Sequence, residues 1–174
     1  MTPLASAAAI AALDAVAVED ARARLTRCCG AGRWVDALLA ARPFRDEAGL
    51  RRAVDRAFDG MERRDWLEAF AHHPKIGDLD SLRQKFASTQ QLTTKEQAGV
   101  ADAADTTLQA LADGNRAYEA RHGFIFIVCA TGKSAGEMLA LLRARLERST
   151  EAELAAAAGE QRKITTLRLG SLSP

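Results

Sequence analysis

The sequence contains few of the residues that hold small secreted or metal-bound proteins together. Its three cysteines include an adjacent pair, Cys28 and Cys29, so neither a CxxC metal-binding pair nor an even set of extracellular disulfides can be drawn. The net charge is only +1, and 5% of the residues are aromatic. We therefore expect no binding to nucleic acid, which attracts strongly basic proteins. The cysteine pattern favours a reducing, cytoplasmic location.

Long hydrophobic runs are also missing. The apolar segment 1–17 has no Lys or Arg ahead of its alanine-rich run and contains Asp14, so we interpret it as the start of a helix and not as a signal peptide. The uncharged stretch 123–131 is much shorter than the roughly 20 residues of a membrane helix. We expect a soluble protein with no membrane partner, folded as a single domain over residues 1–174.

Apolar residues recur at spacings of three and four along almost the whole chain, which is typical of helices. The sequence predicts an all-α fold, a bundle of about seven to nine helices. Proline and glycine mark the predicted helix ends, because proline lacks an amide proton and the residue before it avoids helical geometry. These ends fall near Gly30, before Arg42-Pro43, at Gly60, at His73 before Pro74, and at Gly123 after a long helix from Thr93.

Two further features concern the C-terminal half. Ser134 with Glu137, and Thr150 with Glu153, match the capping-box pattern and predict the starts of the last two helices. The run Phe124, Ile125, Phe126, Ile127 and Val128 has the composition of a strand but no partner strand in the sequence. Since a lone strand cannot satisfy its own backbone, we predict a buried, extended connector there.

Several candidate sites have simpler structural interpretations. Gly132-Lys133-Ser134 looks like the end of a phosphate-binding loop, but that motif needs a glycine where the chain has Ile127, so Ser134 is interpreted as a helix cap. His72 and His73 are adjacent and cannot share a metal at the i, i+4 spacing of zinc sites, so no metal is predicted. His122 suits the dipole at a helix C-terminus.

Two residues keep a functional interpretation beside the structural one. His73 is held at a helix end against Pro74, a rigid edge of the type that carries sites. Glu96 could simply complete a capping box with Thr93. The same helix N-terminus, with Thr93, Glu96 and Gln97, also favours an anionic ligand.

Three motifs taken together resemble one family. His73-Pro74-Lys75-Ile76-Gly77-Asp78, Thr93-x-x-Glu96-Gln97-Ala98-Gly99 and Tyr118-x-x-Arg121-x-Gly123-Phe124-x-Phe126-Ile127 are similar to segments of the 2-oxo-4-hydroxy-4-carboxy-5-ureidoimidazoline (OHCU) decarboxylases, which act last on the route from urate to allantoin. The likeness extends over nearly the whole chain. It includes Lys163-Ile164-Thr165-x-Leu167-Arg168-Leu169 near the C-terminus.

The resemblance implies an all-helical homodimer that needs no cofactor, with His73 and Glu96 as the catalytic pair. It also implies that the Phe124–Cys129 connector lines the substrate pocket with its main chain. Where the family commonly has Ser, this chain has Thr93, which keeps the hydroxyl. The predicted substrate-binding residues are Pro74, Thr93, Gln97, Phe124, Ile125, Phe126, Ile127, Val128 and Arg168.

The sequence leaves Arg168 open between two roles. It could be a surface arginine near a helix C-terminus, or it could bind a polar ring with a ureido arm and a carboxylate, which a planar guanidinium suits.

Two other functions also remain open for the whole chain. One is a ring-opening hydrolase of the same pathway that uses His73 to activate water, and the other is a helical interaction module without an active site.

Overall fold

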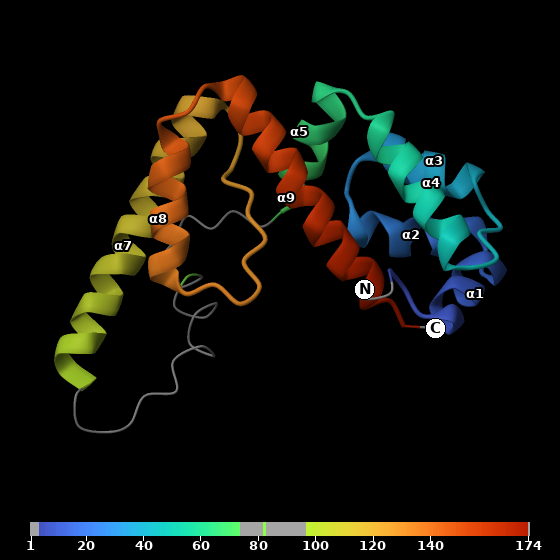
Figure 1. The fold of residues 1–174 in the computed structure, drawn as a ribbon, viewed down its shortest axis with the longest axis horizontal. Coiled ribbons are helices and arrows are strands. Elements are labelled where there is room, and N and C mark those ends of the chain that lie inside the picture. The colour runs from blue at the N-terminus through green and yellow to red at the C-terminus, as the bar shows by residue number, and fades with distance from the viewer. Residues whose placement is uncertain (1–3, 74–81, 83–96, 174) are drawn as a thin grey trace. The chain divides into compact units, whose positions relative to one another are not determined.

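A computed structural model describes residues 4–73, 82 and 97–173, with side chains from residue 105 in the last range. These residues form eight labelled helices and no strand, which confirms the all-α prediction and lies within the predicted number of helices (Figure 1). The helices are α1 (Ala7–Ala15), α2 (Val18–Cys28), α3 (Gly32–Ala40), α4 (Glu47–Asp59), α5 (Arg63–Ala71), α7 (Gln97–His122), α8 (Ala135–Leu146) and α9 (Thr150–Gly170). Within these ranges no helix is both long enough and apolar enough to span a bilayer.

The predicted helix ends agree with the structure at most positions. α3 ends at Ala40, three residues before Pro43, and Gly60 caps α4. α7 ends at His122, and Gly123 follows with a φ of +79°, a left-handed conformation that glycine adopts without a steric penalty. The first helix differs from the prediction, because extended backbone at Val16 separates α1 from α2.

The chain divides into two compact units, and α9 contributes to both. Residues 1–73 and 158–174 form the first unit, and residues 74–157 form the second. The predicted single domain over 1–174 stays a prediction.

In the first unit α3 packs against α2, α4 and α5. Its core contains an aromatic cluster: the ring of Phe58 lies 5.6 Å from Trp34 and stacks on Trp66 at 5.7 Å between centroids.

In the second unit α7 packs along α8 (Figure 1). Residues 125–130 belong to neither a helix nor a strand, as predicted for the connector. The buried ring of Tyr118 lies edge-on to Phe124 and Phe126, with centroids 5.9 and 5.2 Å away. These contacts bury the apolar connector without a sheet.

One predicted capping box is present and the other is wrong. Ser134 and Glu137 exchange side-chain and backbone hydrogen bonds at the start of α8. At the start of α9, the hydroxyl of Ser149 accepts the amide proton of Ala152 instead. Glu153 does not fold back on Thr150, because its carboxylate is buried against Arg145.

Candidate active site

His73 lies immediately after α5, in a turn that the chain makes before Pro74. Its amide donates to the carbonyl of Phe70 at 3.1 Å, which closes the last turn, and its side chain is half-buried. The predicted helix end is therefore confirmed, since α5 stops at Ala71 and His72 caps it. This turn fixes the backbone that carries the imidazole.

The neighbouring His72 packs against the link between α2 and α3. A Cβ built on Gly30 would lie 2.1 Å from Cγ of His72 and 2.5 Å from its Cβ. No real pair of carbon atoms approaches so closely without bonding, so only glycine leaves room for this ring. Gly30 therefore holds the turn that precedes His73 close to the end of α2.

The imidazole of His73 is bound by a buried amide. Its Nε2 lies 2.6 Å from Oε1 of Gln161 on α9, and Gln161 is fully buried. The amide nitrogen of Gln161 donates to Oγ1 of Thr165 at 3.1 Å, and that hydroxyl donates to the carbonyl of Cys28 at 3.3 Å. A row of three hydrogen bonds thus connects His73 to the end of α2.

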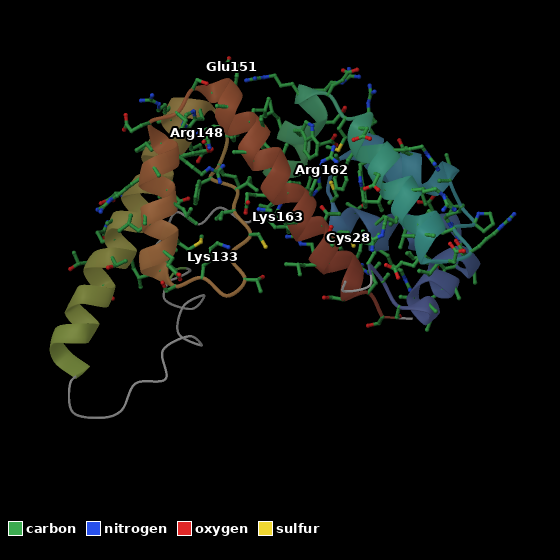
Figure 2. All side chains as sticks on the ribbon, viewed as in Figure 1. Cys28, Lys133, Arg148, Glu151, Arg162 and Lys163 are labelled. Atoms are coloured by element: carbon green, nitrogen blue, oxygen red, sulfur yellow. The ribbon has the colours of Figure 1, made fainter. Side chains whose placement is uncertain are left out.

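Arg168 joins the same end of α2. Its Nη1 donates to the carbonyls of Arg27 and Cys28 at 3.3 and 3.4 Å, and the residue is half-buried. The last carbonyls of a helix lack intrahelical donors and form the negative end of its dipole, so a guanidinium is favoured there. Figure 2 shows Cys28 beside the C-terminal part of α9.

The thiol of Cys28 is not a candidate nucleophile. Burial raises its pKa to about 11, although the charges of Arg168 and Arg27 oppose that shift. The thiolate is the reactive form of cysteine, so this thiol is inert near neutral pH. Among the residues with described side chains, no group of three or more His, Cys, Asp or Glu could hold a metal ion.

The connector in the second unit is held by a buried arginine. Arg145 donates through Nη1 to the carbonyl of Ile127 at 2.8 Å, and its guanidinium lies over the ring of Phe126, 4.7 Å from the centroid. Phe124, Phe126 and Ile127 are buried, whereas Ile125 and Val128 are partly exposed. Arg145 therefore fixes the main chain at the centre of the run that was predicted to bind substrate.

Other predicted residues lie elsewhere or outside the described part of the chain. Pro74, Thr93 and Glu96 are outside it, as is the side chain of Gln97, the first residue of α7. His122 ends α7 as predicted, but its ring is buried, with Nδ1 3.2 Å from the hydroxyl of Thr150. Lys133, from the rejected phosphate-loop motif, donates to the carbonyl of Cys129 at 2.8 Å.

Sequence reasoning missed Gln161, Thr165 and the role of Arg145. The signal for the first two was present, because α9 buries a stripe at a spacing of four residues. Its fully buried members are Glu153, Ala157, Gln161, Thr165 and Leu169. Two neutral polar residues in such a stripe need buried hydrogen-bond partners, and one of those partners is His73.

The sequence of this chain is similar to those of a known protein family and of two characterised relatives. The sequence profile of the OHCU decarboxylase family matches residues 14–170. A uric acid degradation bifunctional protein from Arabidopsis thaliana is 35% identical over 145 residues, which are 83% of this chain and 45% of that protein. The chain thus spans less than half of that relative. A 2-oxo-4-hydroxy-4-carboxy-5-ureidoimidazoline decarboxylase from Haloferax volcanii is 27% identical over 137 residues, with 78% of this chain and 79% of that protein covered.

Solved structures show the same fold. A crystal structure of an OHCU decarboxylase in the presence of (S)-allantoin matches with a TM-score of 0.65 and 35% identity, covering 83% of this chain and 92% of the other. A crystal structure of an (S)-allantoin synthase matches with a TM-score of 0.66, covering 92% of this chain and 52% of the other. At 20% identity, the second match supports the fold alone.

Proposed function

The chain belongs to the OHCU decarboxylase family, and from this premise we propose that it is a carboxy-lyase that converts OHCU to (S)-allantoin and CO2. The observation that carries the proposal is the family match over residues 14–170, within which His73 is held by a buried amide at a helix end. Histidine titrates near neutral pH, which suits a residue that must exchange a proton with substrate.

The substrate itself explains why no cofactor is proposed. One ring carbon carries a hydroxyl and a carboxylate, and the neighbouring ring carbon belongs to an imine. When the bond to the carboxylate breaks, its electron pair moves into the imine, and CO2 leaves. The ring therefore supplies the electron sink that other decarboxylases obtain from a cofactor.

The remaining enol must gain a proton on carbon from one face, and its hydroxyl must lose one to become a carbonyl. The imine nitrogen and the carbon each gain a proton, and the hydroxyl loses one. The substrate anion therefore takes up one proton overall. We propose His73 as the group that exchanges the proton with carbon, and Glu96 as the carboxylate that holds the hydroxyl or orients the ring. These roles follow from the family resemblance and from the acid–base range of the two side chains.

Further substrate contacts are proposed for the remaining predicted residues. A guanidinium such as Arg168 offers paired donors to the ureido arm, which an ammonium cannot reproduce. The apolar connector Phe124–Val128 suits the departing carboxylate, because a salt bridge to that charge would stabilise the ground state and slow its loss. Pro74, Thr93 and Gln97 complete the proposed contacts.

The test generates the unstable substrate from urate with the two preceding enzymes and then adds this protein. Circular dichroism follows the handedness of allantoin, and a carbonate assay follows CO2. We expect rapid formation of the S form alone, with one CO2 per allantoin. A ureido acid without CO2 would indicate the ring-opening hydrolase. A slow racemic product equal to the control without enzyme would leave the interaction module as the explanation.

We further propose a cytoplasmic homodimer. The family resemblance supports the dimer. The three cysteines, which form no disulfide, support the cytoplasmic location. Light scattering of the purified chain should give twice its 18.7 kDa mass, and a mass of one chain would contradict the dimer. Cell fractionation tests the location.

A further inference from the structure

The hydrogen bonds from Gln161 to Thr165 and from Thr165 to Cys28 run in one direction. The carbonyl of Cys28 can only accept, so the single hydroxyl proton of Thr165 is used in donating to it at 3.3 Å. Toward Gln161 that hydroxyl can then only accept, and it accepts from Nε2 of the amide at 3.1 Å. The amide oxygen therefore points at His73.

This direction decides which nitrogen of His73 carries a proton. Oε1 of Gln161 is an acceptor without a proton, and it lies 2.6 Å from Nε2 of the imidazole. Nε2 must therefore be protonated in both the neutral and the charged ring. Since Gln161 and Thr165 are fully buried, water does not compete for these bonds, and reversing the row would lose the hydrogen bond from Thr165 to the carbonyl of Cys28.

We infer that Gln161 and Thr165 are positioning residues that hold the proton on Nε2 of His73, so that Nδ1 is the nitrogen that exchanges a proton with the substrate. The inference rests on the proposed function for its catalytic part. In the step itself, the Nδ1–H bond of the imidazolium breaks as the C–H bond of allantoin forms. The nitrogen keeps the electron pair, and a proton from water restores the imidazolium.

The proposal explains why a neutral amide occupies this position on α9. A carboxylate there would add a negative charge beside the imidazole and would favour its charged form. An apolar residue would leave the two tautomers of the neutral ring free to exchange. A glutamine whose orientation is fixed by Thr165 selects one tautomer without adding charge.

The first test reads the imidazole directly in the free protein. Long-range proton–nitrogen NMR spectra of the full chain at about pH 8.5 observe the neutral rings, because the ordinary pKa of histidine is about 6.5. The chain has three histidines, and His73→Asn identifies the resonance of interest. We expect His73 to be protonated on Nε2. Protonation on Nδ1 in the wild type would overturn the inference whether or not the protein is a decarboxylase.

The second test uses Thr165→Val, which keeps the shape of the side chain and removes the hydroxyl. We expect a mixture of His73 tautomers and a fall in kcat of about 10- to 100-fold, with little change in KM. That range is the one found when a metal-ligating histidine loses the partner that orients it. Thr165→Ser should restore both. Gln161→Leu should resemble Thr165→Val.

A neighbouring residue gives the matched control. Thr166 is exposed on the same helix and donates to the carbonyl of Arg162 within that helix. Thr166→Val should therefore change neither the tautomer nor kcat. If Thr165→Val behaves like this control in both measurements, Thr165 does not position His73. If the wild type forms no (S)-allantoin, the proposed function fails, and the NMR spectrum still decides the tautomer.

Discussion

Arg145 and Glu153 form an ion pair of 2.8 Å between Nε and Oε2, in which the carboxylate side chain has no exposure to solvent. The hydroxyl of Tyr118 donates to the same oxygen at 2.6 Å. Burial and this carboxylate raise the pKa of the Tyr118 phenol, so it remains a donor at neutral pH. The pair connects α7, α8 and the start of α9 within the second unit, and through Arg145 it holds the carbonyl of Ile127.

We predict that Glu153→Gln destabilises the protein by about 3–5 kcal/mol, because removing one partner of a buried ion pair leaves the other charge uncompensated. Urea denaturation followed by circular dichroism measures the loss. Asp36→Asn provides the control, since Asp36 pairs with Arg22 on the surface and such pairs contribute about 0–1 kcal/mol. Equal effects of the two substitutions would contradict this account of the pair.

We predict that Gly30→Ala reduces decarboxylation by about tenfold or more, because a displacement near 1 Å at a catalytic group can cost about 100-fold. The added Cβ would collide with the ring of His72 and shift the turn that carries His73. Gly32→Ala is the control, because its nearest neighbour would be an oxygen of Glu68 at an ordinary 3.6 Å. Steady-state rates of both variants decide whether the turn positions His73.

We predict that Arg168→Lys weakens binding of allantoin more than tenfold with little loss of stability. A lysine keeps the charge beside the last carbonyls of α2 but not the planar set of donors. Isothermal titration measures the affinity, and Arg143→Lys, at an exposed arginine of α8, provides the control. Unchanged affinity would restrict Arg168 to capping α2.

We predict that Glu96→Gln removes turnover while preserving stability. Glutamine is also accepted at the third position of a capping box, so a purely structural Glu96 would tolerate the change. Glu96→Ala should additionally lose about 0.5–2 kcal/mol if the cap is present. Rates and thermal midpoints of the two variants separate the roles, and normal turnover of Glu96→Gln would exclude the carboxylate from catalysis.

The features that local sequence determines were predictable. Pro43, Pro74 and Gly123 mark helix ends because their backbone constraints act wherever they occur, and Ser134 with Glu137 forms a box within one turn. The pattern at Thr150 failed for a tertiary reason. A buried guanidinium from α8 attracts the Glu153 carboxylate more strongly than a terminal amide does.

The polar row around His73 was not predictable from local pattern. Thr165 meets its acceptor, Cys28, across 137 positions of sequence, and Gln161 meets His73 across 88. No spacing rule connects such distant residues. The family resemblance implies a catalytic role for His73, and the sequence leaves Arg168 open between two roles. Only the packing of α9 brings both residues to the end of α2.

The central claim is that His73 transfers the proton in a stereospecific decarboxylation, and the most direct measurement compares His73→Asn with His72→Asn. Both variants receive substrate generated from urate, and circular dichroism records the appearance of (S)-allantoin. General acid–base residues contribute about 10²- to 10⁴-fold, so His73→Asn should lose that much rate while keeping its helical spectrum. His72→Asn, which retains Cβ and Cγ against Gly30, should remain active. A His73→Asn variant with more than about half of the wild-type rate would contradict the claim, since that loss is far below the contribution of a proton-transfer group.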